Sequence, residues 1–322
     1  MRDVPTFPEI PLDKLRVGAC LDYVKLKFEV CLSEGIPEDN KHQWTRLEDG
    51  TGWVLTLHDP DPKELARLDH DLGDEAVLYG FELSVDFWPS DKVAGDEKES
   101  LLKTAFASLA PRFRPDDELM FGVGMKGGFG SSKPIPIDSR LPSPNETLVY
   151  SHRDEGHQAK LYLKTRDQGQ ALPVGEQRVR LETTLTRYAA MAYRWHDPPA
   201  EPFDRLRDLA TNGLRRRFAK VFRIIDRPEL RDPNRFDRAK REDLERTMWA
   251  AWQRAGVNAF AGPDLHPDAL PKAKVSRNKR ETYNDHLPQS LYRLRRDVAT
   301  NKKIGNALYV LDRRLQRSFS HL

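Results

Sequence analysis

The sequence predicts an α+β fold: a mostly antiparallel sheet with helices on one face, followed by an all-helical basic domain. Three observations predict it. Segments within the first 190 residues alternate apolar and polar side chains, as half-buried strands do. The stretches between these segments are too short for repeated crossover helices, which favours antiparallel pairing. Beyond residue 203, apolar residues recur at helical spacing among arginines.

Each element is expected from its periodicity. In residues 77–87 (VLYGFELSVDF) every odd-numbered side chain is apolar or aromatic, and the even-numbered ones include Glu82, Ser84 and Asp86. Alternation or short apolar runs predict the other strands at 21–30, 53–57, 119–123, 147–151, 159–165 and 178–186. Helices are expected at 62–71, 97–110, 203–225, 236–255 and 289–319.

Composition marks the expected loop and linker. Residues 122–146 are rich in Gly, Ser and Pro, which predicts a long surface loop. A proline cluster at 197–202 predicts a linker. It divides the antiparallel-sheet domain expected at 1–196 from the basic helical domain expected at 203–322.

Charge divides the chain at the same place. Residues 1–200 contain 25 Lys and Arg against 34 Asp and Glu, a net charge of −9, whereas residues 201–322 contain 28 against 16, a net charge of +12. A region this basic binds polyanions with salt-dependent affinity. We therefore expect the C-terminal part to bind nucleic acid, and some carboxylates of the acidic part to hold a metal or act on a phosphate.

Several classes of protein are disfavoured by the composition. No apolar run approaches the ~20 residues of a membrane span, and the N-terminus lacks the apolar core of a signal peptide. A cytoplasmic protein without membrane contact is expected. Cys20 and Cys31 are expected to be free thiols, and the spacing of zinc ligands is absent.

The strand expected at 178–186 is the richest in candidate site residues. Its alternation sends Arg178, Arg180 and Glu182 to the face opposite its apolar side chains, with Tyr188 in the same phase. One interpretation is a phosphate site, in which the arginines bind phosphate and Glu182 holds a divalent metal or acts as a base. The alternative is a solvated outer face with cross-strand ion pairs.

Acidic residues on two other strands are candidate metal ligands. Glu82 and Asp86 share a polar face but stand ~13 Å apart along a strand, so one of them, paired with Glu182 across the sheet, could form a site. Asp22 falls in phase with the apolar Val24. It either caps the start of its strand or faces the site from a neighbouring strand. Such oxygen ligands predict Mg²⁺ or Mn²⁺.

The strand expected at 159–165 offers a possible nucleophile. Lys160, Tyr162 and Lys164 lie on its polar side. A tyrosine can attack a phosphodiester and form a covalent phosphotyrosine, or it can stack on a base. Tyr162 is therefore a candidate catalytic residue, and Lys164 a candidate phosphate contact.

Five short motifs follow one another within roughly residues 20–190: TLHDP (56–60), FELSVDF (81–87), TLVYSHR (147–153), AKLYLK (159–164) and VRLET (179–183). As an ordered set they resemble one known family, the replication-initiation factors of rolling-circle plasmids and filamentous phages. The resemblance implies a protein that binds a replication origin and nicks one strand with a tyrosine and a divalent metal, so that the 3′ hydroxyl primes synthesis. It also implies that Glu182 is the glutamate of the family's Arg-x-Glu strand, and that Asp22 or Asp86 is its acidic metal ligand.

Departures from the family pattern leave the nucleophile open. Some members carry the tyrosine immediately before that glutamate, where this chain has Leu181. Tyr188 is the first choice because it shares the polar side of the Glu182 strand, and Tyr162 and Tyr193 follow. The origin sequence, the oligomeric state and recruitment of a helicase are not decided by the sequence, although dimers are common in such initiators.

The basic C-terminal region is expected to bind the phosphates of double-stranded or single-stranded DNA. Its candidate contacts are Arg215, Arg216, Arg217, Lys220, Arg295 and Arg296. A solvated helical bundle with many ion pairs is the alternative interpretation of these charges. Three functions therefore remain: a nicking replication initiator, a non-catalytic DNA-binding regulator on the same scaffold, and an unrelated metal-dependent phosphodiesterase or RNA-binding protein.

Overall fold

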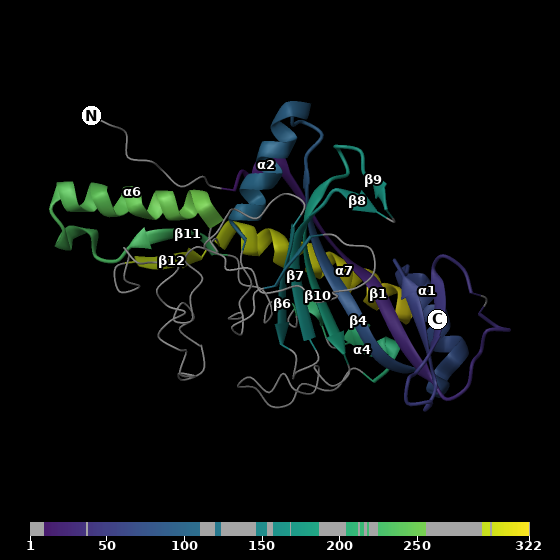
Figure 1. Ribbon diagram of the computed structural model, residues 1–322. Helices are drawn as coiled ribbons and strands as arrows, with labels where there is room; N and C mark the ends of the chain where they lie inside the picture. The colour runs from purple at the N-terminus through teal and green to yellow at the C-terminus, as the bar shows by residue number, and fades with distance from the viewer. Residues whose placement is uncertain are drawn as a thin grey trace.

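In the computed structural model the chain has an α+β fold, with helices packed on an antiparallel sheet as predicted (Figure 1). The structure describes residues 10–36, 38–109, 120–123, 146–152, 157–167, 169–186, 204–211, 213–215, 218, 225–255, 292–296 and 298–321. The predicted linker at 197–202 lies outside these residues. None of the helices within them is both long and apolar enough to cross a membrane.

The sheet has eight strands in the order β2-β3-β1-β4-β10-β7-β6-β5. They are β1 (Leu15–Phe28), β2 (His42–Arg46), β3 (Trp53–His58), β4 (Val77–Pro89), β5 (Met120–Val123), β6 (Glu146–His152), β7 (His157–Lys164) and β10 (Arg178–Thr186). Every neighbouring pair is antiparallel. Two small ribbons pair β8 (Arg166–Asp167) with β9 (Gln170–Ala171), and β11 (Ile225–Leu230) with β12 (Tyr292–Arg296). The four strands β1, β4, β10 and β7 are consecutive in the sheet, so their side chains can meet on one face.

Five α-helices lie within the described residues. They are α1 (Pro62–Leu72), α2 (Gly95–Ala107), α4 (Leu206–Thr211), α6 (Arg238–Ala255) and α7 (Val298–Ser320). The start of α1 shows why this segment is helical: Asp61 accepts a hydrogen bond from the Lys63 N–H, Glu64 accepts one from the Asp61 N–H, and Pro62 occupies the first turn. Short 3₁₀ turns span Leu12–Lys14, Gly73–Glu75 and Pro233–Arg235.

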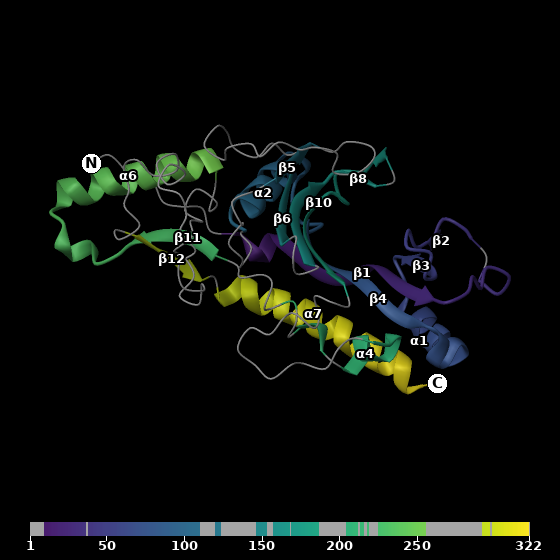
Figure 2. The ribbon, with the colours of Figure 1, turned by 60° about the horizontal axis from the view of Figure 1, so that its bottom comes forward.

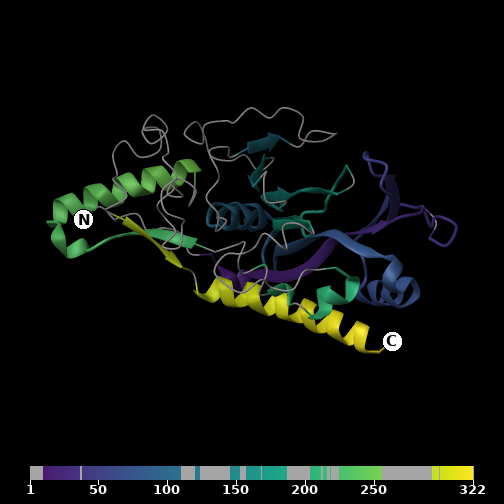
Figure 3. The same cartoon turned by 90° about the horizontal axis from the view of Figure 1, so that it is seen from below.

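One apolar cluster joins the sheet to helices α1, α2, α4 and α7. Phe81 and Leu83 of β4 lie in it together with Phe106 of α2 and with Leu308 and Leu311 of α7. Figures 2 and 3 show α7 running along β1 and β4, which agrees with the packing of its leucines. Because successive residues of a strand point to opposite faces, Glu82, Ser84 and Asp86 of β4 face away from this cluster. That second face carries the candidate site.

Some predicted elements were wrong, each for a physical reason. The first strand begins at Leu15 and not at residue 21, and β2 was not predicted. The helix predicted at 289–319 begins at Val298, because residues 292–296 (YRLRR) alternate apolar and basic side chains and pair with β11 as a strand. The region predicted to be all helical therefore contains a strand pair, β11–β12.

Candidate active site and metal centre

A β-bulge in β1 brings Asp22 to the polar face of the sheet. Leu21 pairs with Leu83 of β4, but Tyr23 pairs with the adjacent Glu82, so Asp22 is an extra residue without a partner. The apolar side chains of β1 are odd-numbered before the bulge and even-numbered after it. Both sets face the core only because one residue is inserted between them. Of the two positions expected for Asp22, the structure has the one that faces the site.

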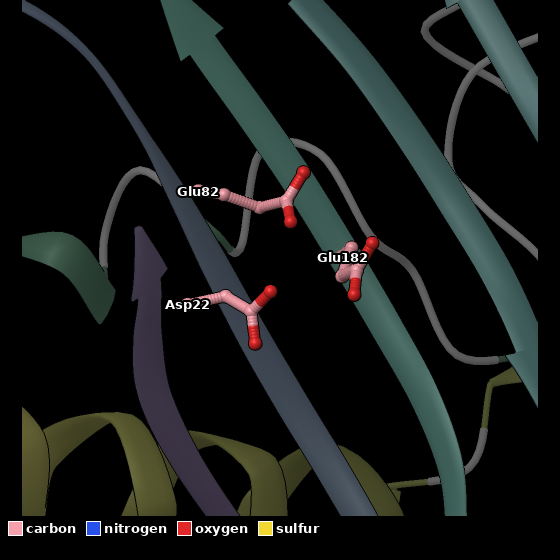
Figure 4. Close-up of side chains that lie close together, drawn as sticks. All are labelled: Asp22, Glu82 and Glu182. Atoms are coloured by element: carbon pink, nitrogen blue, oxygen red, sulfur yellow. The ribbon is translucent and has the colours of Figure 1, made fainter. Parts of the chain in front are cut away.

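Three carboxylates converge on this face. Asp22 of β1, Glu82 of β4 and Glu182 of β10 each offer an oxygen, and these oxygens all lie within 4.8 Å of one another. Figure 4 shows the three side chains pointing toward one another from three different strands. Glu82 and Glu182 are each only 3% exposed. Burying several carboxylates so close together requires compensating positive charge.

Lys160 of β7 supplies part of that charge. It lies directly across from Glu182 in the β7–β10 ladder. Its ammonium donates to Glu82 Oε2 at 3.1 Å and to Glu182 Oε2 at 3.2 Å. Sequence reasoning placed Lys160 on the polar side of its strand but missed its role, because the register of β7 against β10 cannot be read from the alternation.

Arg180 supplies the rest and is not available as the simple phosphate contact that was predicted. Its guanidinium binds Asp86 through Nε and Nη2, both at 2.7 Å. Its Nη1 donates to Asp22 and lies 3.5 Å from Glu182 Oε1. Asp86 was predicted as a metal ligand, but it is not one of the three converging carboxylates, and both of its carboxylate oxygens bind Arg180 instead. Arg180 in turn orients the carboxylates of Asp22 and Glu182.

Arg178 and Lys164, the two other phosphate contacts predicted on this sheet, also interact with groups of the protein itself. Arg178 Nε lies 3.1 Å from Asp86 Oδ2 without forming a hydrogen bond, and its Nη1 donates to the carbonyl of Glu176 at 3.0 Å. Its guanidinium stacks over the ring of Trp88 at 5.6 Å. Lys164 pairs with Asp167 at 3.1 Å.

Two tyrosines border the carboxylates. The Tyr162 hydroxyl donates a hydrogen bond to Glu182 Oε1. On the other side, the Tyr23 hydroxyl lies 3.4 Å from Thr184 Oγ1, which donates to Glu82 Oε2 at 2.5 Å. Tyr162, the second choice of nucleophile, thus touches the cluster directly. Tyr188, the first choice, and Tyr193 lie outside the described residues.

Burial and the neighbouring charges shift the pKa values of this site in opposite directions. Burial, with Glu182 beside it, raises the pKa of Glu82 to about 7. Burial also acts to raise the pKa of Asp22, but Arg180 outweighs it and lowers that pKa. Burial and the negative charge of Glu182 raise the pKa of Tyr162. Lys160 is buried, which opposes its charge, yet Glu182 and Glu82 raise its pKa.

The donor set fits a hard divalent cation. Octahedral Mg²⁺ at ~2.1 Å from each ligand places its oxygens between ~3.0 and ~4.2 Å apart, so oxygens within 4.8 Å of one another need only small movements to share an ion. The hydroxyl of Ser84 supports this assignment. It is fully buried, lies across from Glu182 on the same face, and has no hydrogen-bond partner among the described residues. Since buried polar groups are normally hydrogen-bonded, this hydroxyl is suited to a bound water or ion beside the carboxylates.

The predicted contacts in the basic region are described only in part. Arg215 is exposed, and Arg295 and Arg296 lie in β12 but their side chains are outside what the structure describes. Arg216, Arg217 and Lys220 lie outside the described residues. Cys20 and Cys31 are both free thiols.

Comparison with known proteins gives no further assignment. No protein-family model, no curated protein and no solved structure matches the chain.

Proposed function

We propose that the protein initiates rolling-circle DNA replication by binding an origin and nicking one strand. In this proposal Tyr162 is the nucleophile, and Asp22, Glu82 and Glu182 hold Mg²⁺ or Mn²⁺. One observation carries it: the Tyr162 hydroxyl is hydrogen-bonded to Glu182 within the carboxylate cluster. A nucleophile, a base and a set of hard oxygen ligands on one face are the parts that phosphodiester cleavage requires.

The chemical step is a transesterification. Tyr162 Oη attacks the phosphorus atom and passes its proton to Glu182. A bond forms between Oη and phosphorus, the bond between phosphorus and the 3′ oxygen breaks, and the 3′ oxygen takes a proton from the Lys160 ammonium. The products are a 5′ phosphotyrosine and a free 3′ hydroxyl, which can prime synthesis. No energy source is consumed because one phosphoester replaces another.

The raised pKa of Tyr162 has a direct consequence for this step. Burial and the charge of Glu182 keep the phenol protonated at neutral pH. A divalent ion on the three carboxylates would offset that charge and polarise the scissile phosphate. Nicking should therefore depend strictly on the added metal.

A covalent adduct tests the proposal. Supercoiled plasmids carrying fragments of the replicon that encodes the chain are incubated with the protein and Mn²⁺. The expected products are nicked circles with protein attached to the 5′ end. Tyr162→Phe should abolish the adduct. Tyr23→Phe, a change at another half-buried tyrosine on the same face, should retain it.

Other results of this experiment would indicate a different nucleophile or no nicking activity. An adduct that survives in Tyr162→Phe but is lost in Tyr188→Phe would move the nucleophile to Tyr188. Thermal unfolding of both variants in EDTA checks that the loss is chemical and not structural. Absence of any adduct in the wild-type protein with bound Mn²⁺ would sink the enzymatic proposal.

A non-catalytic DNA-binding regulator is the second candidate. The observation that favours it is the internal balance of charge, since Lys160 and Arg180 already pair with all three carboxylates. In that case the cluster would be a buried ion-pair network that rigidifies the sheet. Origin binding without nicking, together with no saturable Mn²⁺ binding, is the result expected for it.

A further inference from the structure

The outward face of α7 carries a stripe of basic and polar side chains, here called the α7 stripe. Its members are Lys302, Asn306, Tyr309, Arg313, Arg314 and Arg317, and the structure exposes each of them. Apart from the adjacent Arg313 and Arg314, successive members are three or four residues apart, so together they form a band ~22 Å long on the helix surface. Figure 3 shows α7 along one side of the molecule, with the sheet on its inner side.

The charge of this stripe is not balanced on the helix. Asp312 is the single acidic residue of α7, and it points inward. Its carboxylate accepts hydrogen bonds from the N–H groups of Leu214 at 2.9 Å and Arg215 at 3.3 Å. Within the described part of the chain, the four cations of the stripe make no salt bridge, and Arg313 donates only to Gln316 at 3.3 Å. As far as the described residues go, no carboxylate neutralises these four charges, which suits an anionic partner.

A neighbouring residue extends the same surface. Arg215 is exposed and lies against Gly305 of α7, where a Cβ atom would come within 3.3 Å of its Nη2. The glycine therefore lets the arginine lie close to the helix. Arg215 adds a fifth cation beside the N-terminal half of the stripe.

Exposed apolar groups lie among these cations. Tyr309 is 52% exposed and the adjacent Val310 is 56% exposed. Single exposed apolar side chains are common on protein surfaces, but these two lie on the same helix surface as the cations of the stripe. A partner that offers phosphates to the arginines and flat or methyl-bearing edges to Tyr309 and Val310 matches both features.

We propose that the α7 stripe docks in the major groove of duplex DNA. The arginines and Lys302 contact phosphates on both sides of the groove, and Asn306 and Tyr309 face the base edges. An α-helix ~10–12 Å in diameter fits a groove ~12 Å wide. The proposal rests on the proposed function only for the choice of DNA as the polyanion.

Two other anionic partners fit the stripe less well. A membrane-surface helix needs a free apolar face, but the apolar face of α7 is buried, with Leu308, Leu311 and Leu315 in the core. Duplex RNA has a deep and narrow major groove that a helix cannot enter. Anionic vesicles and an RNA duplex therefore serve as comparison ligands in the test.

The salt dependence of binding gives the sharpest readout. Affinity for a 30-base-pair mixed-sequence DNA duplex is measured by fluorescence anisotropy between 50 and 200 mM NaCl. Each lost phosphate contact lowers the slope of log K against log salt by ~0.9, so the triple variant R313A/R314A/R317A should lower it by about 2.7. Its affinity at 150 mM salt should fall at least about tenfold. The variant R313K/R314K/R317K should keep most of the slope.

The matched control removes the same charge elsewhere. The variant R46A/R166A/R235A changes three exposed arginines away from α7, and it should leave the slope within about 0.5 of the wild-type value. Equal changes in the two alanine variants would overturn the proposal, because they would show only an effect of net charge. Tighter binding of the RNA duplex or of phosphatidylserine vesicles through the same arginines would overturn it as well.

The test separates this inference from the proposed function. If the chain does not nick DNA but the triple variant alone loses the salt slope, the docking surface stands without the enzyme. If nicking is observed and the slope does not respond to R313A/R314A/R317A, the enzyme stands and the docking surface fails.

Discussion

Lys160 Nζ lies 3.2 Å from Glu182 Oε2 and directly across the β7–β10 ladder from it. The same ammonium is 3.1 Å from Glu82 Oε2. A positive side chain thus occupies the space between two carboxylates that could otherwise bind a metal ion. The protein carries its own cation at the candidate metal centre.

Replacing this lysine should therefore strengthen metal binding. In Lys160→Met the two glutamates lose their bound ammonium, so we expect the Kd for Mn²⁺ to fall by at least about tenfold. Isothermal titration or the EPR signal of free Mn²⁺ measures the change. Lys103→Met, an exposed lysine of α2 that pairs with Glu99 at 2.6 Å, is the control and should leave the Kd unchanged. Weaker binding in Lys160→Met would show that the lysine is needed to hold the site together.

The pKa of Glu82 predicts how the metal-free protein responds to pH. Burial and Glu182 raise this pKa from its usual 4.5 to about 7 in the folded state. The contribution of the neutral carboxyl to stability is complete below about 4.5 and is lost as the pH rises through about 7.

Thermal unfolding in EDTA between pH 4.5 and 8 measures this effect. The wild-type melting temperature should decline across that range, and Glu82→Gln should flatten the decline because its amide does not titrate. The exposed Glu99→Gln serves as the control and should follow the wild-type curve. Identical slopes for wild type and Glu82→Gln would contradict the prediction.

Removing Asp86 should destabilise the fold strongly. Arg180 is 2% exposed and depends on Asp86 for its two 2.7 Å hydrogen bonds. Asp86→Ala leaves part of a buried guanidinium unpaired, and we expect a loss of about 3–5 kcal/mol in the free energy of unfolding. Urea denaturation measures it. Asp167→Ala, which breaks a pair at the protein surface, should cost less than about 1 kcal/mol.

If the cost of Asp86→Ala comes from the unpaired arginine, removing Arg180 as well should recover part of it. The double variant Asp86→Ala/Arg180→Met should thus be more stable than Asp86→Ala alone. A double variant that is less stable would show that each side chain contributes through packing rather than through the pair.

His42 should act as a second pH-sensitive contact, between β2 and α1. Burial opposes its charge, but Asp39 and Glu64, each 3.0 Å away, raise its pKa above 6.5. The stabilisation is complete below about 6.5 and is lost as the pH rises through the raised value. An NMR titration of the His42 ring should give a pKa above 6.5 that falls in Glu64→Gln. A pKa at or below 6.5 in the wild type would contradict this assignment.

Much of the sheet could be predicted from the sequence, because most of its strands contain a stretch of alternating apolar and polar side chains. The strand predicted at 178–186 has the same bounds in the structure, and the helix predicted at 62–71 ends at Leu72. In contrast, β12 was predicted as helix, since arginines at close spacing suit either element. The local sequence cannot reveal the partner strand that decides between them.

The candidate site was harder to predict because it depends on register. Strand phase correctly placed Glu82, Glu182 and Tyr162 on polar faces. It did not predict that Lys160 pairs with two carboxylates or that Arg180 pairs with Asp86. Asp22 left a usable signal. The apolar positions of β1 change from odd at Leu21 to even at Val24, which indicates one inserted residue between them.

That inserted residue has a consequence for how such a site could arise. Without the bulge, a regular ladder between β1 and β4 would contribute no third carboxylate, and one of the two apolar sets of β1 would face the wrong side. The cluster could therefore be gained or lost through a single-codon insertion or deletion, in one step and with the rest of the sheet unchanged. In relatives of this protein, a gap of one residue at position 22 would mark the loss of the third carboxylate together with the bulge that presents it.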